Sequence, residues 1–209
     1  MTSLQSGNYR KKADMFNEII IATGNAGKFK EFTDIIRGIS GGNFAKDITF
    51  ASYISRMVVE ETGKTYAENA MLKARAWAEN SGLPCLADDS GLEVDALDGA
   101  PGLYSARVVA GNDSNHSAWL LSQLEGVENR KARFVAALCL CVPGEYTLIT
   151  EGYCYGSISE TARGDKGFGY DPVFMPEGYN LTFAEMDSRI KNQISHRANA
   201  FTKLASLLK

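Results

Sequence analysis

Apolar residues change their spacing several times along the chain, and each change predicts an element. The β-branched run at 19–22 predicts a buried strand. From Lys28 the apolar positions recur at helical spacing as far as Gly41-Gly42, so a helix is expected there. A second helix is expected over 66–81, because alanines line one side of it and Gly82 provides a stop signal.

The second half of the chain mixes extended and helical patterns. The first extended stretch contains Ser90-Gly91, which predicts an interruption there, and Pro143-Gly144 predicts the turn of a hairpin. These elements are expected over 86–97 (extended), 114–124 (helix), 132–142 and 146–155 (strands) and 195–208 (helix). A strand–helix–strand beginning followed by a hairpin favours an α/β fold, a mixed β-sheet flanked by helices.

Composition and charge narrow the class of protein. The chain has 209 residues, 44 % of them apolar, which is enough for a hydrophobic core and excludes a disordered protein. Its 22 Lys and Arg residues against 25 Asp and Glu residues give a net charge of −3, which argues against a nucleic-acid partner. We expect a loosely ordered leader over 1–17 and a single domain over 18–209.

The chain shows no targeting or membrane segment. No stretch approaches the ~18 apolar residues of a membrane-spanning helix, and the basic residues at 10–12 lack the apolar run of a secretory signal. Four cysteines and two histidines offer no zinc-binding spacing. We therefore expect buried free thiols in a cytoplasmic protein.

The segment Thr23-Gly24-Asn25-Ala26-Gly27-Lys28 joins the first strand to the first helix. Its two glycines allow a tight turn with outward N–H groups, and the helix N-terminus and Lys28 add positive charge, which suits an anion. It is not the phosphate loop of common NTPases, because Ala22 replaces the first glycine and Phe29 follows the lysine. An ordinary strand-to-helix turn is the competing interpretation.

Two acidic segments offer carboxylates. Asp88 and Asp89 point to opposite faces if the chain is extended, so only one is expected to face a given cleft. That carboxylate can hold Mg²⁺ or deprotonate a water, although Asp-Asp-Ser-Gly is also an ordinary turn. Glu60 or Glu61 can supply a second carboxylate, and the pattern does not choose between them.

Three other polar positions have plain structural interpretations. Thr65 and Glu68 fit the capping box of the second helix. Lys73 shares a helix face with Asn69, which alone is typical of a solvated lysine. His116 lies in a polar stretch and is expected to be solvated.

Two segments near the C-terminus combine aromatic and donor groups. The glycine-rich loop at 164–172 can lay Phe168 against a planar base, although a turn that buries its aromatic rings is the alternative. Lys191 and His196 lie close to a helix start for which Ser195 is the expected N-cap. Arg197 opposes the helix dipole there, which indicates an anionic or strongly accepting group nearby.

These segments together resemble the inosine triphosphate pyrophosphatase family. The resemblance rests on T-G-N-A-G-K at 23–28, E-E-T-G-K-T-Y-A-E-N-A at 60–70, A-D-D-S-G-L-E-V-D at 87–95, G-F-G-Y-D-P-V-F at 167–174 and S-H-R at 195–197. It implies an elongated mixed sheet in two lobes with the active-site cleft between them, a homodimer, and Mg²⁺-dependent hydrolysis of dITP, ITP and XTP to the monophosphate and pyrophosphate.

The resemblance also implies roles for single residues. Asp89 would be the catalytic carboxylate and a metal ligand, with Glu61, slightly favoured, or Glu60 as the other ligand. Ser90 would contact the substrate. The other implied substrate-binding residues are Thr23, Gly24, Asn25, Ala26, Gly27, Lys28 and Lys73 for the triphosphate, Phe168, Gly169, Tyr170 and Asp171 as the lining of the base pocket, and Lys191, His196 and Arg197 for the base and its 6-oxo group.

Other functions compete with this interpretation. One is a pyrophosphatase for other modified or pyrimidine nucleotides, and another is a nucleotide-binding regulator without catalysis. A nucleic-acid-binding module is more distant because the net charge is negative. The lysines at 28, 73 and 191 and Arg197 are expected to meet at one cleft and to make it locally basic.

Overall fold

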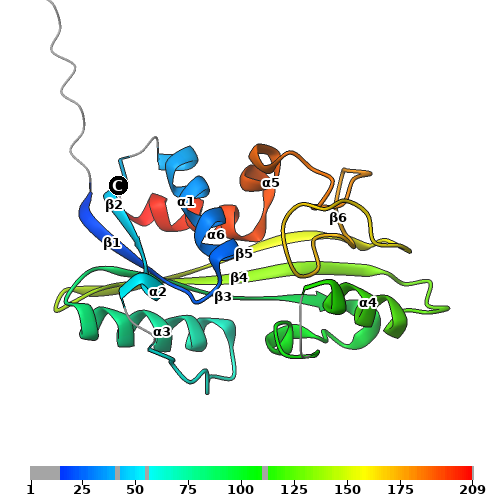
Figure 1. Cartoon of the computed structure of the whole chain (residues 1–209), viewed down its shortest axis with the longest axis horizontal. Coiled ribbons are helices and arrows are strands. Elements are labelled where there is room, and N and C mark those ends of the chain that lie inside the picture. The colour runs from blue at the N-terminus through cyan, green and yellow to red at the C-terminus, as the bar shows by residue number, and fades with distance from the viewer. Residues whose placement is uncertain (1–14, 41–42, 55–56, 110–112, 209) are drawn as a thin grey trace, which may run out of the picture.

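The computed structural model describes residues 15–40, 43–54, 57–109 and 113–208, and within them the chain forms a six-stranded mixed sheet flanked by helices (Figure 1). The strands are β1 (Phe16–Ala22), β2 (Ala45–Phe50), β3 (Cys85–Val94), β4 (Lys131–Val142), β5 (Tyr146–Ile158) and β6 (Phe174–Pro176). The helices are α1 (Ala26–Ser40), α2 (Ala51–Ile54), α3 (Tyr66–Ser81), α4 (Asp113–Gln123), α5 (Ser188–Ile194) and α6 (His196–Leu207), with short 3₁₀ turns η1 (Asp95–Leu97) and η2 (Gly102–Tyr104). The α/β class expected from the pattern is confirmed.

The strand order is β2-β1-β3-β4-β5-β6. β1 pairs in parallel with β2 and β3, whereas β3, β4, β5 and β6 pair antiparallel in sequence. The predicted hairpin is confirmed as β4 and β5, and its two long strands run from one end of the elongated molecule to the other (Figure 1). The sheet therefore provides one rigid support for both sides of any cleft near its middle.

β3 differs from its prediction. The interruption expected at Ser90-Gly91 is wrong, because β3 pairs with β4 without a break from Cys85↔Cys141 to Val94↔Ala132. A turn-favouring tetrapeptide stays extended here because ten consecutive cross-strand pairs supply its backbone hydrogen bonds, and such pairing outweighs local preference.

Three hydrophobic clusters hold helices against the sheet. α1 and α6 cover one face through a cluster that includes Phe32 and Phe201, and α3 covers the other through Trp77. α4 contributes Leu120 to a third cluster at the far end, together with Phe174 from β6. In Figure 1 α1 and α6 lie above the long strands, and α3 and α4 lie below them.

The helix signals succeed where the pattern is strong. α3 has the predicted bounds, Thr65 accepts a hydrogen bond from the Glu68 amide, and Gly82 adopts the left-handed conformation after the last turn. The short elements β2, α2, β6 and α5 were not predicted, because segments of three to seven residues carry too few periodic positions.

The cysteines, the N-terminal segment and the lengths of the helices can also be compared with the expectations from the sequence. All four cysteines are free and buried, as expected. Residues 1–14 of the expected leader lie outside the described residues, and Phe16 and Asn17 belong to β1. None of the helices in the described part of the chain combines the length and the apolar character needed to cross a bilayer.

Gly152 controls how closely α6 approaches β5, and this contact generates a stability prediction. A Cβ at Gly152 would lie 2.2 Å from both the Ala200 amide nitrogen and the His196 carbonyl oxygen, which are backbone atoms that cannot rotate away. We expect Gly152→Ala to lower the free energy of unfolding in urea by about 2–3 kcal/mol or more, since overpacking displaces the helix.

The matched control is Gly38→Ala. Gly38 lies within α1, and no heavy atom of the described residues lies within 4 Å of its added Cβ. We expect this change to stabilise the protein by about 0.5–1 kcal/mol through helix propensity. Equal effects of the two substitutions would contradict the importance of the close α6–β5 contact.

Candidate active site

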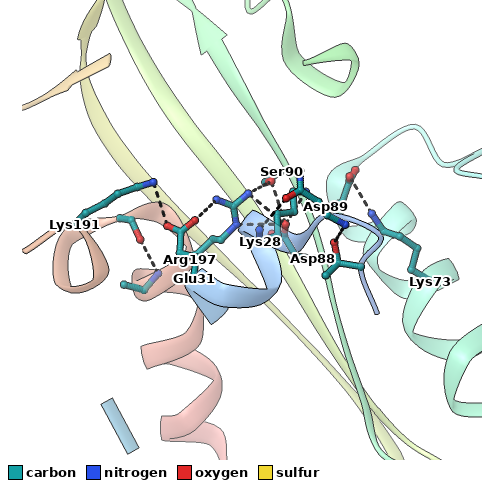
Figure 2. Close-up of polar contacts among 12 residues, drawn as sticks. Lys28, Glu31, Lys73, Asp88, Asp89, Ser90, Lys191 and Arg197 are labelled. Atoms are coloured by element: carbon teal, nitrogen blue, oxygen red, sulfur yellow. Dashed lines mark hydrogen bonds and ion pairs between the residues drawn. The ribbon is translucent and has the colours of Figure 1, made fainter. Parts of the chain in front are cut away.

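Charged side chains from α1, α3, β3, α5 and α6 form one row of polar contacts across the middle of the sheet (Figure 2). Lys191 lies at one end of the row and Lys73 at the other, with Arg197 and Lys28 between them. The structure thus brings together the four cations that were expected to meet.

Asp88 lies at the centre of this row. Its Oδ2 atom is 2.8 Å from Lys28 Nζ and 3.4 Å from Arg197 Nε. Burial raises the pKa of this carboxyl group, but the neighbouring Lys28 and Arg197 outweigh burial and hold the pKa far below its usual range. Asp88 is therefore a permanent anion that positions two cations, a role that the sequence did not predict.

Arg197 links the centre to the side of the base-binding candidates. It donates to Glu31 (Nη1 to Oε2, 3.0 Å) and to Ser90 Oγ (2.8 Å). Lys191 in turn donates to Asp171 Oδ2 (2.7 Å) and lies 3.6 Å from Glu31 Oε1. The anion expected near Arg197 is thus supplied by the protein's own buried carboxylates.

Asp89 occupies the other face of β3, as strand alternation predicts. Lys73 Nζ lies 3.3 Å from Asp89 Oδ1 and 2.6 Å from Glu61 Oε1, and Asn69 donates to Asp89 Oδ2 at 3.1 Å. Lys73 is therefore not the solvated lysine that its helix position alone suggested. α3, whose N-cap is Thr65, places Asn69 and Lys73 one turn apart on the side that faces β3.

Two carboxylates beside Lys73 have different acidities. Burial and the charge of Glu61 raise the pKa of Asp89, although Lys73 opposes them. Burial also acts to raise the pKa of Glu61, but Lys73 and Arg107 outweigh it and lower the pKa. A pair of neighbouring acids with separated pKa values is typical of a site in which one acid accepts a proton while the other stays ionised.

The donor set beside Lys73 fits a hard divalent cation. Glu61 and Asp89 are bridged by one lysine, whereas the Glu60 side chain is exposed. No group of three or more His, Cys, Asp or Glu with metal-binding geometry occurs among the described residues. Two carboxylates without further protein ligands match Mg²⁺, which keeps water or phosphate oxygens in its remaining positions.

The expected basic character of the cleft is wrong. Each of the four cations contacts at least one carboxylate, and they face the five carboxylates of Glu31, Glu61, Asp88, Asp89 and Asp171. Arg107 also pairs with Glu61, so five cations face five carboxylates and the group carries no excess of positive charge. The expectation counted only lysines and arginines, and it did not assign the carboxylates of Glu31 and Asp88 to the site.

The segment 23–28 is ordered by side chains rather than by its glycines. Asn25 Oδ1 accepts from the Lys28 amide (3.0 Å) and so caps α1, and Thr23 Oγ1 accepts from the Asn25 amide (3.1 Å). Neither Gly24 nor Gly27 has a positive φ, so the turn between β1 and α1 does not depend on the left-handed conformation that glycine allows. Gly27 instead allows close approach, because a Cβ there would lie 2.9 Å from the ring of Phe168.

The loop at 164–172 brings Phe168 to this segment. The Phe168 amide donates to Asp171 Oδ2 (2.9 Å), which also accepts from Lys191, so Asp171 fixes the loop from within. Lys191 Nζ and the Arg197 guanidinium each lie 5.3 Å from the centre of the Phe168 ring. Tyr170 is buried and donates to the Ser105 carbonyl (2.9 Å), so it supports the loop from below.

His196 lies deep beside this loop. Ser195 caps α6 by accepting from the Ala198 amide, as predicted, and directs His196 inward. Its ring stacks on Phe134 with centroids 4.7 Å apart and planes 10° apart. Burial and the charge of Arg197 lower the pKa of His196 well below its usual value, so the imidazole is neutral.

Two adjoining cavities lie beside these groups, one at the lysines and carboxylates and one at the aromatic rings. One, of about 540 Å³, is lined by Thr23, Lys28, Glu61, Lys73 and Asp88. The other, of about 240 Å³, is lined by Phe134, Phe168, Asp171, His196 and Arg197. Asn25, Lys28 and Ala106 line both, so the cavities meet at the start of α1.

Sequence reasoning missed several residues of the site. Glu31 and Asp88 pair with the cations, and Asn69 donates to Asp89. The signals in the sequence were that Glu31 shares a helix face with Lys28, and Asn69 with Lys73. His116 was expected to be solvated, and this is wrong: it is 7 % exposed and lines the smaller cavity. The helix itself was expected over 114–124, but its packing against Tyr170, which buries His116, could not be read from the polar sequence.

Comparisons with known proteins show the family to which the chain belongs. The model of the Ham1 family matches residues 19–207. A Bacillus licheniformis protein named "dITP/XTP pyrophosphatase" is 47 % identical over 91 % of this chain and 97 % of that protein, and an Aquifex aeolicus protein of the same name is 43 % identical over 92 % and 96 %.

Solved structures show the same fold. The Staphylococcus aureus Ham1 protein superposes with a TM-score of 0.78 at 38 % identity, covering 91 % of this chain and 97 % of that one. A HAM1 protein from Coxiella burnetii gives 0.77 at 38 % identity, with 91 % and 98 % covered. The resemblance detected in the sequence is confirmed, and the chain belongs to the Ham1 family.

Proposed function

We propose that this chain is a nucleoside triphosphate pyrophosphatase that hydrolyses deaminated purine nucleotides such as dITP and XTP to the monophosphate and pyrophosphate. The relatives named for this activity support the substrate class. The observation that carries the proposal is the pair of adjoining cavities, one lined by lysines and carboxylates and one by aromatic rings and buried donors. A triphosphate in the first and a base in the second would place the α-phosphorus near their junction.

Asp89 is the proposed general base. Asn69 and Lys73 fix the orientation of its carboxylate, so that an oxygen is held ready to accept a proton. A water attacks the α-phosphorus and passes its proton to Asp89, while the bond to the β-phosphate oxygen breaks and pyrophosphate leaves. Lys28 and Lys73 stabilise the negative charge on the phosphate oxygens.

Glu61 and Asp89 would hold Mg²⁺. The metal, when bound, neutralises phosphate charge. The cations of the site are already paired with carboxylates, which supports this requirement, because the charge of a triphosphate then needs a further cation to balance it. We further propose, from the family resemblance, a homodimer; a location in the cytoplasm stays a prediction.

Base selection follows from the donors around the smaller cavity. Lys191 and Arg197 carry only donors, and neutral His196 still carries one N–H. Hypoxanthine and xanthine present an acceptor at position 6, whereas adenine presents an amino group. An adenine base would turn its amino group toward these cations and would leave the N–H of His196 unpaired, which discriminates against ATP.

Asp89→Asn tests the general base. We expect the rate of pyrophosphate release from ITP with Mg²⁺ to fall about 10²- to 10⁴-fold while ITP still binds, because the amide cannot accept the proton. The control is Asp95→Asn, which alters an exposed acid just beyond the end of β3 and should leave the rate unchanged. Unchanged hydrolysis by Asp89→Asn would remove this residue from the mechanism, and release of inorganic phosphate alone would contradict attack at the α-phosphorus.

Gly27→Ala tests the contact between the phosphate segment and the base loop. The added Cβ would press on the Phe168 ring and on Asn25 Oδ1, which lies 3.0 Å from its position. We expect KM for ITP to rise about five- to thirtyfold, which corresponds to about 1–2 kcal/mol. The melting temperature should change little, and Gly38→Ala serves again as the control; an unaltered KM would show that the ring moves away freely.

The neutral state of His196 predicts a pH dependence of stability. Its pKa is lowered in the folded protein, so below about pH 6.5 the unfolded chain binds a proton that the folded chain does not. Stability is therefore lost as the pH falls, at about 1.4 kcal/mol per pH unit once well below that value. Urea unfolding between pH 7.5 and 5.5 should show a shallower loss for His196→Gln, and equal slopes would indicate a histidine that is protonated in the fold.

A further inference from the structure

The smaller cavity contains a second buried histidine that the proposed chemistry does not use. His116, on α4, is 7 % exposed, and neither of its ring nitrogens has a hydrogen-bond partner among the described residues. Its ring meets Tyr170 edge-on, with centroids 5.7 Å apart and planes at 74°. A buried polar ring without a partner is costly unless a ligand or water completes its hydrogen bonds.

Among the described residues, the side-chain hydroxyl groups that line this cavity already have hydrogen-bond partners. The Ser105 hydroxyl donates to a backbone carbonyl and accepts from a backbone N–H, and Tyr170 donates to the Ser105 carbonyl. The partly buried Ser90 accepts from Arg197. In contrast, neither ring nitrogen of His116 or of His196 has a hydrogen-bond partner among the described residues. The two histidines are therefore free to bind a heterocycle in this cavity.

The two histidines approach the cavity from different sides. His196 comes from α6 together with Arg197, whereas His116 comes from α4, and Figure 1 shows these helices on opposite sides of the long strands. The donors assigned to the 6-oxo group all come from α5 and α6. A planar base held by them turns another polar edge toward α4.

We propose that His116 contacts the edge of the base that carries position 2. This assignment rests on the proposed function. Hypoxanthine, xanthine and guanine differ at that position, which bears hydrogen, an oxo acceptor or an amino donor. An imidazole ring has two nitrogens that can donate or accept, so it can make a different hydrogen bond with each of the three bases. His116 thereby contributes to discrimination at position 2, and the α6 residues to discrimination at position 6.

His116→Phe is the decisive variant, because phenylalanine keeps an aromatic ring against Tyr170 and removes both nitrogens. We expect the kcat/KM ratios XTP/ITP and GTP/ITP to change about three- to tenfold, the size of one neutral hydrogen bond, while ITP/ATP stays within about twofold. His116→Gln, which keeps a donor and an acceptor, should lie nearer to the wild type.

Ser117→Ala is the matched control. The neighbouring Ser117 hydroxyl donates to the Gly169 carbonyl (3.0 Å) and so supports the base loop without lining the cavity. Its loss should lower turnover of all four nucleotides by the same factor. Calorimetric binding of IMP, XMP and GMP provides a second measurement that does not require catalysis, and the same change of ratios is expected there.

The outcomes separate the assignment from the function. Unchanged ratios, or an equal loss for every nucleotide, in both His116 variants would overturn the contact with position 2. A change confined to ITP/dITP would overturn it in favour of a ribose contact, and a change in ITP/ATP alone would place His116 at the 6-position. If the wild-type chain released no pyrophosphate from ITP, the proposed function itself would fail, and the assignment with it.

Discussion

The buried guanidinium of Arg197 is the constraint on which the site depends. It is 4 % exposed and is held by Glu31 from α1 and Asp88 from β3, so one charge joins two helices to a central strand. Burying such charges requires close pairing, since removing one partner leaves an uncompensated ion at a cost of about 3–5 kcal/mol. The same carboxylates also contact Lys191 and Lys28, so each cation is oriented by a neighbour before any substrate arrives.

This arrangement explains how a chain with slight negative charge can bind a polyanion. The cations are not a free positive surface, because each is shared with a carboxylate. Preorganised charges in a water-poor site stabilise developing negative charge without having to reorient at the moment of reaction. A long nucleic acid needs an extended basic surface, whereas one triphosphate needs a few well-placed donors, and the row in Figure 2 provides only the latter.

Elements with long periodic patterns were predictable from the sequence, and residues fixed by tertiary pairing were not. α3 and the β4–β5 hairpin have clear periodicity and stop signals, so their bounds agree closely. β3 was predicted with a break because local turn preference cannot register the ladder with β4. The roles of Asp88 and Glu31 depend on which cations approach them from distant segments, and the burial of His116 depends on α4 packing against Tyr170.

The unbroken pairing of β3 with β4 has a consequence for how the chain tolerates change. Asp88 and Asp89 face opposite sides only because the register is fixed, and side chains in a strand alternate with a period of two. Insertion or deletion of a single residue ahead of this pair would exchange their faces, so Asp88 would turn away from Lys28 and Arg197, and the proposed proton acceptor Asp89 would turn away from Lys73. Insertions and deletions that the loops of the fold can absorb are therefore not tolerated in this strand. The placement of the two acids depends on the register between β3 and β4 as much as on the identity of the residues.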